Sequence, residues 1–423
     1  MKQTLLKYKY HFLLVIIALI WINIFDFLTQ IASQGLIYPD SKSYLVSAKN
    51  LYVFYRGHNY RPVLMAIING FPYLFGFSDT AIYSFSFFVN LVCWLTFFVV
   101  LFEIFKEFLQ PKKAFVLSII PVFFIGNSTF VFHLLTENIY MLFIVFGFYF
   151  LVKYYKTKAF LYLSIALSIF ILCMLIKPGA KFLAIVFLLF FIKEIIRNYK
   201  SKFTLIIYGS VLMVLVQCAG IKHQFGNFTI SYIDAVTYYN YLGSRAEFIK
   251  TGKEYEQINN PRNEYIYNLE CKDQKKIAFK DLKNQLQFNT INLVKAYISD
   301  VVENSITGNI YVKDSKNIKN KSFFDVSKTI LFAISEWQNR FFSFFGFVLG
   351  IFYFFKSYKN EKQYSCIAFF ILYTIVLSGM SYDQGDRFHA VTFPFTLLLA
   401  VKFITEKTTF LKKTKRFSAL LQK

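Results

Sequence analysis

Five charged residues lie at the ends of apolar runs, where acids and bases are seldom placed without a partner or a function. Asp40 and Glu137 are the acids. Lys177 and Arg387 are cations at the edges of later apolar runs, where ammonium and guanidinium groups are suited to holding a phosphate. Arg61 follows Asp40 in the same polar loop. Because the five lie far apart in the sequence, they form a site only if the fold brings them to one face.

Each of these residues also has a purely structural interpretation. Asp40 precedes a helical pattern and is suited to capping its first turn. Arg61 and Arg387 are suited to anchoring the chain at the lipid boundary. Glu137 could be solvated between two short spans, and Lys177 stands in a Lys-Pro-Gly turn that also breaks a helix. Shared placement is therefore the feature that favours function.

The elements that would carry these residues are membrane-spanning helices. The chain has 423 residues, of which 56% are hydrophobic and only 17% charged, too apolar a composition for ordinary soluble domains. A crossing needs about 20 mostly apolar residues. The pattern therefore predicts an all-α polytopic membrane protein with about ten spans, near residues 10–30, 78–102, 113–131, 134–152, 159–176, 180–196, 203–221, 337–355, 364–381 and 388–404.

Basic residues predict the orientation of these spans, because short cytoplasmic loops retain Lys and Arg. They cluster at residues 2–9, 106–113, 153–158, 193–202, 356–362 and 407–416, and all six clusters fall on one side in the ten-span arrangement. Both termini are therefore expected in the cytoplasm, with the N-terminal apolar run retained as the first helix. This distribution accounts for much of the formal charge of +23 and argues against a nucleic-acid partner.

The opposite side receives the first loop, residues 31–77, and a long polar segment. In the loop, apolar positions 44, 45, 48, 51, 52 and 55 share one helical face, and Arg61-Pro62 opens a second short apolar run, so two juxtamembrane helices are expected. We expect an N-terminal membrane module (1–221), a mainly helical external segment (222–336), C-terminal spans (337–404) and a basic cytoplasmic tail (405–423). No disulfide is predicted, because only Cys271 lies in a long polar segment.

Several stretches together resemble the GT-C superfamily of integral membrane glycosyltransferases, which includes the protein O-mannosyltransferases and the lipid A aminoarabinose transferase. PDSKSYLVSA is similar to the first-loop acid of that family, and RPVLMAII to the entry into its second juxtamembrane helix. LTENIYMLF through MLIKP and GDRFHAVTFPFTLLLA resemble later motifs, and FNTINLVKAYISDVVEN resembles an external amphipathic helix. The chain departs from the family in having Ser41 after Asp40 and Phe388 in place of a tyrosine.

The resemblance implies an enzyme that transfers a sugar, with inversion, from a polyprenyl-phosphate donor to a glycan, lipid or protein acceptor at the external face. Asp40 would be the catalytic base, with Glu137 the second catalytic carboxylate. Arg387, Lys177 and, more weakly, Arg61 would bind the donor phosphate. No cofactor is implied with certainty, and a divalent metal would need Glu137 or a loop acid beside Asp40 and Ser41. The expected location is the plasma (inner) membrane, and the Lys-, Ile-, Phe- and Asn-rich composition suggests a bacterial host.

Other classes of protein remain open at this stage. A polymerase or ligase of surface polysaccharide would use a polyprenyl-diphosphate donor and could draw arginines from residues 222–336. A transporter of lipid-linked sugars is expected to show two repeated halves with broken spans, and no internal repeat is found. A scaffold that has lost its active site is also compatible with the departures at Ser41 and Phe388.

Overall fold

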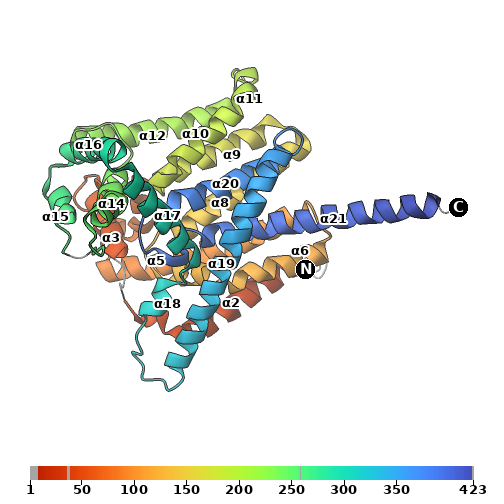
Figure 1. Cartoon of the computed structure of the whole chain (residues 1–423), viewed down its shortest axis with the longest axis horizontal. Coiled ribbons are helices and arrows are strands. Elements are labelled where there is room, and N and C mark those ends of the chain that lie inside the picture. The colour runs from red at the N-terminus through yellow and green to blue at the C-terminus, as the bar shows by residue number, and fades with distance from the viewer. Residues whose placement is uncertain (1–7, 36–38, 258, 422–423) are drawn as a thin grey trace.

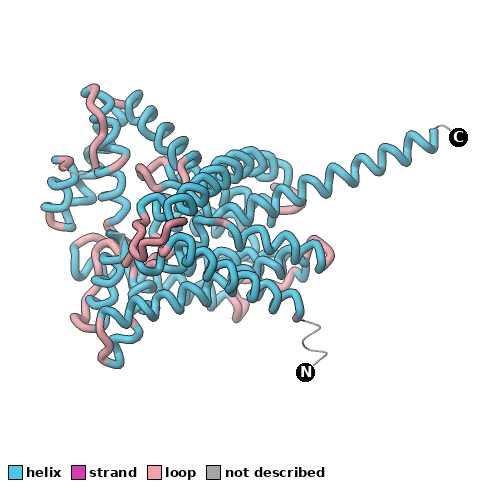
Figure 2. The backbone as a smooth tube through the Cα atoms, turned by 90° about the horizontal axis from the view of Figure 1, so that it is seen from below, coloured by secondary structure: helices cyan, strands magenta, loops and turns pink. Residues whose placement is uncertain are grey.

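The computed structural model describes residues 8–35, 39–257 and 259–421. The regular secondary structure of these residues is helical throughout, and the coloured part of Figure 2 consists of helices and loops. The prediction of an all-α fold is therefore confirmed. Of the predicted basic clusters, Lys2 and Lys7 lie outside the described residues, as do the side chains of residues 408–423.

Six helical segments are long and apolar enough to cross a membrane. They are α2 (Lys9–Thr29), α5 (Asp79–Lys106), α8 (Glu137–Thr157), α12 (Thr204–Phe225), α19 (Phe324–Ser357) and the segment Gly385–Lys407, which joins η7 (Gly385–Arg387), η8 (Ala390–Thr392) and the start of α21 (Phe393–Leu421). A seventh candidate is a broken helix, α6 (Pro111–Ile119) and η3 (Ile120–Phe123) followed by α7 (Ile125–Thr129) and η4 (Phe130–Phe132), bent by 67°.

The remaining predicted spans coincide with shorter apolar helices. These are α9 (Phe160–Leu172) with η5 (Cys173–Leu175), η6 (Pro178–Ala180) with α10 (Lys181–Phe190), and α20 (Lys362–Ser378). At about 1.5 Å per residue, such helices fall short of a hydrocarbon core roughly 30 Å thick. The protein is a multi-pass membrane protein, but the count of about ten spans is not confirmed.

Two helices lie between α2 and α5, as predicted for the first loop. After η1 (Ile31–Ser33) come α3 (Pro39–Tyr52) and α4 (Val63–Asn69), followed by η2 (Phe71–Phe75). The Tyr52 hydroxyl donates to the carbonyl of Ile67 at 2.8 Å, and the ring covers Gly70, where a Cβ atom would lie only 2.5 Å from it. The contact joins the end of α3 to α4, on the two sides of the loop that contains Arg61.

The polar segment between α12 and α19 is also helical. The short helix α11 (Ile192–Arg197) precedes α12. After α12, the polar segment forms α13 (Ile233–Asn240), α14 (Leu242–Thr251), α15 (Pro261–Asn268), α16 (Cys271–Phe288), α17 (Thr290–Ile306) and α18 (Ile310–Asp314). It has a small core of its own, with Val236, Ala246 and Ile266 buried. In Figure 1, α14, α15 and α16 gather with α3 at the left, while α9, α10, α12 and α21 extend to the right.

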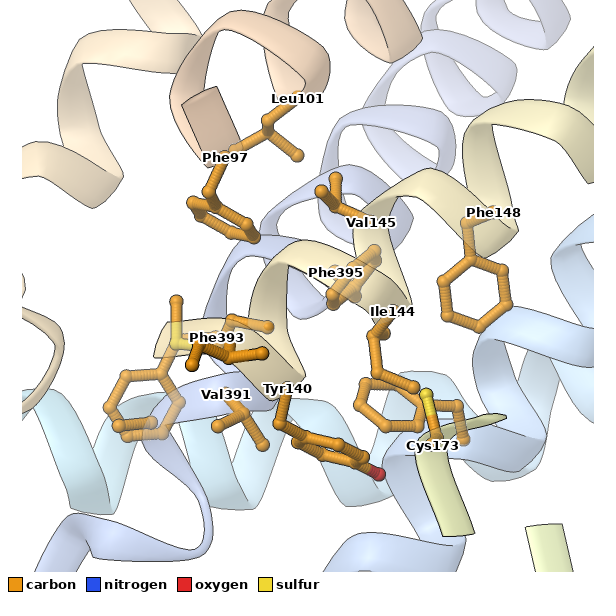
Figure 3. Close-up of a cluster of buried hydrophobic side chains, with 14 of the residues drawn as sticks. Phe97, Leu101, Tyr140, Ile144, Val145, Phe148, Cys173, Val391, Phe393 and Phe395 are labelled. Carbon is orange, nitrogen blue, oxygen red and sulfur yellow. The ribbon is translucent and has the colours of Figure 1, made fainter. Parts of the chain in front are cut away.

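The main core lies between the apolar helices and is rich in phenylalanine. Figure 3 shows residues of α5, α8, η5 and the η8–α21 region in one cluster, with Phe148 at its right-hand side. The Phe148 ring contacts the rings of Phe170, Phe187, Phe370 and Phe395, with centroids 5.0 to 6.3 Å apart. Lipid tails are as apolar as these side chains, so close packing, rather than escape from water, holds such helices together.

Candidate active site

Asp40 lies in the first turn of α3, one residue after Pro39. Proline is well suited to the first helical position because its missing N–H has no partner there, and a carboxylate is stabilised by the helix dipole at this end. Both oxygens of Asp40 bind arginines: Oδ1 is 2.5 Å from Arg61 Nη2, and Oδ2 is 2.7 Å from Arg387 Nη1. The carboxylate therefore points into a charged cluster, and these bonds are not those of a helix cap.

Arg61 is held in place by three contacts besides Asp40. Its Nε donates to Ser43 Oγ at 2.9 Å, its Nη1 donates to the Tyr44 hydroxyl at 3.3 Å, and its guanidinium lies over the Tyr44 ring at 4.4 Å from the centroid. Ser43 and Tyr44 occupy the next turn of the helix that carries Asp40. Arg61 thus orients Asp40 within the protein and does not reach outward as a lipid anchor.

Arg387 joins the two predicted catalytic acids. In addition to its contact with Asp40, its Nε donates to Glu137 Oε1 at 2.7 Å. Glu137 is the first residue of α8 and is completely buried. The same oxygen is 3.5 Å from Nζ of Lys177, whose ammonium also lies 4.9 Å from the ring centroid of Phe388. All five residues predicted from the sequence therefore form one ion-pair network.

The network controls the protonation of Asp40. Burial alone would raise the pKa of this carboxyl, but the positive charges of Arg387 and Arg61 outweigh that effect and hold the pKa of Asp40 well below its usual range. Asp40 is therefore ionised at neutral pH, yet in this arrangement it is a weak proton acceptor. Three cations face two carboxylates, so the cluster has an excess of one positive charge.

Buried amide groups of the polar segment hold the loop that carries Arg387. Asn304 on α17 donates through Nδ2 to the carbonyls of Ser378 and Ser381, at 3.0 and 2.7 Å, and its Oδ1 accepts from the backbone N–H of Gln384 at 2.9 Å. Asn304 is completely buried. Sequence reasoning missed it, because an asparagine in an Asn-rich polar segment gives no signal of its own.

Asn309 and a glycine complete the support of this loop. Asn309 Nδ2 donates to Asp386 Oδ1 at 2.8 Å, and both side chains are buried. Gly385 has a φ of +54°, and a Cβ atom there would lie 2.3 Å from the carbonyl oxygen of Gly308. A larger residue at 385 would therefore strain the backbone and push the loop away from α18.

Other polar residues near the predicted site have structural contacts instead. Lys181, four residues after Lys177 in the sequence, has its Nζ 2.6 Å from Asp234 Oδ2 on α13. His389 lies buried between two hydroxyls, with Nδ1 2.7 Å from Ser343 Oγ and Nε2 2.9 Å from Ser378 Oγ. These residues therefore connect helices and are not available to a substrate in this arrangement.

The site does not fit a divalent cation well. No group of three or more His, Cys, Asp or Glu side chains that could hold a metal occurs in the described ranges 8–35, 39–257 and 259–421. Hard cations such as Mg²⁺ or Mn²⁺ favour several oxygen ligands. Here the only two carboxylates of the cluster, Asp40 and Glu137, are already neutralised by guanidinium and ammonium groups.

Comparison with known proteins gives one sequence match and two structural similarities. Residues 59–220 match the model of the dolichyl-phosphate-mannose-protein mannosyltransferase family, a range that includes Arg61, Glu137 and Lys177 but not Asp40 or Arg387. A search of curated protein sequences finds no significant match.

The two similar structures are forms of the oligosaccharyltransferase of Archaeoglobus fulgidus. One, AglB in complex with an inhibitory peptide and a dolichol-phosphate, has 12% sequence identity and a TM-score of 0.43, and the similarity covers 97% of this chain and 52% of that one. The other is tethered to an acceptor peptide containing the NVT sequon. It has 11% sequence identity and a TM-score of 0.42, and the similarity covers 95% of this chain and 50% of that one. The chain spans about half the length of these proteins.

The apolar helices surround a buried charged cluster, and residues 59–220, less than half of the chain, are similar to the mannosyltransferase family. This match over part of the chain agrees with the resemblance to the GT-C superfamily that the sequence predicts.

Proposed function

We propose that this enzyme moves a sugar from a polyprenyl-phosphate donor to an acceptor hydroxyl at the outer face of the membrane. The observation that carries the proposal is the single network formed by Asp40, Glu137, Arg61, Lys177 and Arg387. It combines a carboxylate that can take a proton with cations that can hold a phosphate. The acceptor, a glycan, a lipid or a protein, supplies the hydroxyl group.

In the proposed reaction the acceptor oxygen attacks the anomeric carbon from the face opposite the phosphate. Its proton passes to Asp40, and the bond between the anomeric carbon and the phosphate oxygen breaks, with the electron pair leaving on the phosphate. The carbon is inverted, and no covalent intermediate with the enzyme is needed. Arg387 and Lys177 stabilise the charge that gathers on the departing lipid phosphate. Glu137 holds both cations in place.

Binding of the donor also prepares the base. The donor phosphate competes with Asp40 for Arg387, because the guanidinium of Arg387 is the group shared between the carboxylates and the phosphate position. As Arg387 turns toward the phosphate, Asp40 loses one of the two positive charges that lower its pKa. The carboxylate therefore becomes a better proton acceptor when the donor is present.

The charge of the cluster favours a monophosphate donor over the diphosphate donor of a polysaccharide polymerase or ligase. A sugar joined to a lipid through one phosphate carries one negative charge, which equals the positive excess of the five-residue network. Lys181, the nearest further lysine in sequence, is paired with Asp234. Since Arg387 already neutralises part of both acids, we propose that no divalent metal takes part.

We place α3 and residues 226–323 on the extracytoplasmic side of a plasma (inner) membrane, with both chain ends in the cytoplasm. Support comes from the basic clusters, which fall on the opposite side in the predicted topology. The division into an N-terminal module, an external segment, C-terminal spans and a tail stays a prediction on the same basis.

Replacement of the proposed base tests the function directly. Purified protein in lipid nanodiscs is given polyprenyl-phosphate and polyprenyl-diphosphate sugars, and release of the lipid phosphate is followed. Asp40→Asn should lower turnover by about 100-fold or more, the usual contribution of a positioned base, and leave membrane insertion unchanged.

Asp79→Asn is the matched control, because Asp79 is an acid of the same loop region that is half exposed and paired with Lys49. It should keep nearly full activity. Turnover in Asp40→Asn close to that of the unmodified protein would rule out the base assignment, and use of the diphosphate donor alone would favour the polymerase class.

A further inference from the structure

Helix α17 exposes an apolar stripe over its whole length. Ile291, Val294, Ile298, Val302 and Ile306 follow at intervals of three or four residues, which places them on one face. Their exposed fractions are 72, 48, 55, 50 and 44%. We call these five residues the outer stripe. In water, a contiguous apolar surface of this kind marks a contact site.

The opposite face of α17 carries buried polar side chains. Its buried residues are Leu293, Ala296, Asp300 and Asn304, and Asp300 is paired with Arg245 of α14. Asn304 binds the loop before Arg387, as described above. The helix therefore turns its acid and amide toward the protein and its aliphatic side chains outward, the reverse of a helix on a water-soluble surface.

Contacts with α19 and α20 place α17 at the end of the membrane-spanning region. The Tyr297 hydroxyl donates to the carbonyl of Val376, near the end of α20, and Arg340 Nε donates to the carbonyl of Ile306. Next to Arg340, Trp337 is 71% exposed. Tryptophan and snorkelling arginine are typical of the membrane–water boundary. In Figure 1, α17 runs at a steep angle to α9, α10 and α12, near their left ends.

The outer stripe continues onto a surface that must face lipid. Beyond Trp337, α19 exposes Phe341 and Phe344, within a helix that qualifies as a membrane span. Along one edge of the stripe, Lys295 and Ser299 are exposed. An ammonium group beside an aliphatic stripe is suited to reaching a lipid headgroup while the stripe contacts acyl chains.

We propose that α17 is an interfacial membrane helix whose outer stripe lies against lipid acyl chains. The bilayer is what covers the outer stripe, because the stripe is continuous with the lipid-facing surface of α19. The loop that carries Arg387 is then bonded to the inner face of a helix that lies at the membrane–water interface. The proposal concerns the position of α17 and stands independently of the proposed reaction.

Site-directed spin labelling tests this position. A nitroxide is attached at Ile298→Cys in a Cys271→Ser background, with the protein in nanodiscs of phosphatidylethanolamine and phosphatidylglycerol. Accessibility to oxygen, which concentrates in the bilayer, is compared with accessibility to a water-soluble nickel chelate. Phe344→Cys on α19 serves as the lipid-facing reference, and Lys280→Cys on α16 as the water-facing one.

The label at residue 298 should resemble the one at residue 344, with oxygen access exceeding nickel access. Nickel access as high as at residue 280 would overturn the proposal. Low access to both reagents would also overturn it, because it would mean that a second protein surface, such as another copy of the chain, covers the stripe.

A matched pair of charge substitutions provides a readout without labels. Ile298→Lys places an ammonium at the centre of the outer stripe, and Asn284→Lys places the same charge at an exposed polar position of α16. In nanodiscs, Ile298→Lys should lower the apparent melting temperature and Asn284→Lys should leave it unchanged. Equal melting temperatures for the two variants would contradict burial of the stripe in lipid.

Discussion

Arg387 binds two carboxylates through different nitrogens, Asp40 through Nη1 and Glu137 through Nε. A guanidinium group presents its donors in a fixed plane, so it can join two acids whose positions are set by separate elements. Lysine presents its donors from a single nitrogen and could not reproduce this contact through two nitrogens of one plane. The residue that holds the resting site together is thus also the one expected to meet the donor phosphate.

Arg61 should tune the base without taking part in the chemistry. A positive charge beside an aspartate lowers its pKa by about 1–3 units. In Arg61→Gln, Asp40 keeps only Arg387, so its pKa should rise toward the usual value. The pH profile of kcat/KM reports the free enzyme. In the unmodified enzyme its acid limb should lie below the usual pKa range of an aspartate. In Arg61→Gln the acid limb should move up by about one pH unit.

The same pairing has a consequence for stability. Because the pKa of Asp40 is lowered in the folded state, its contribution to stability is present above the pKa of the unfolded chain and is lost as the pH falls toward the folded-state pKa.

Arg61→Lys is the control for the kinetic effect of Arg61→Gln. It keeps the charge and should restore most of the acid limb. An acid limb that stays in place in Arg61→Gln would show that Arg61 has only a packing role.

Chelation of metal ions should leave the rate unchanged. Asp40 and Glu137 share three cations, and a divalent ion would have to displace at least one of them. Treatment with EDTA, followed by the same lipid-phosphate assay, should therefore give full activity. A loss that Mg²⁺ or Mn²⁺ restores would show that Arg387 leaves the carboxylates in the working enzyme.

At the level of elements, α17 supports the loop that carries Arg387. Asn304 satisfies two carbonyls and one N–H of the turn that precedes Arg387, and it does so from a completely buried position. Three backbone groups thus depend on one side chain. The polar segment therefore helps to hold the proposed active site and does not merely cover it.

Asn304→Ala should raise the KM for the donor. Each buried backbone group left without a partner costs about 1–3 kcal/mol, and part of this cost is relieved if the loop shifts and moves Arg387. We expect a donor KM about tenfold higher, corresponding to 1.4 kcal/mol, with a smaller change in kcat.

Ser305→Ala is the control for Asn304, since the Ser305 hydroxyl bonds only to the carbonyl of Val301 in its own helix. It should leave both constants near their original values. A fall in melting temperature for Asn304→Ala with no change in donor KM would reduce Asn304 to a structural residue.

The sequence could predict these elements only in part. Asp40 and Arg387 stand out because charged residues at the ends of apolar runs are rare. The supporting residues Asn304 and Asn309 do not, since their role depends on which loop the fold places opposite them. The pairing of Lys181 with Asp234 was equally hidden, because nothing in the sequence fixes how α13 packs beside α10.

At the scale of the whole molecule, composition and basic clusters predicted a multi-pass helical membrane protein, and the fold bears this out. The number of spans was harder to predict, because hydropathy measures apolar length and not straightness. Residues 113–131 were predicted to form one span, but the chain bends by 67° between η3 and α7. Phe124 adopts an extended conformation at the break. Hydropathy alone could not predict this break.

The excess of one positive charge in the cluster has a last consequence, for turnover. The proposed donor arrives as a monoanion, but the lipid phosphate left behind is a monoester whose charge at neutral pH approaches two. A site that stabilises the emerging charge also binds the finished product more tightly than the substrate. The lipid phosphate product should then act as a competitive inhibitor of the donor. Its release, rather than the chemical step, should be rate-limiting.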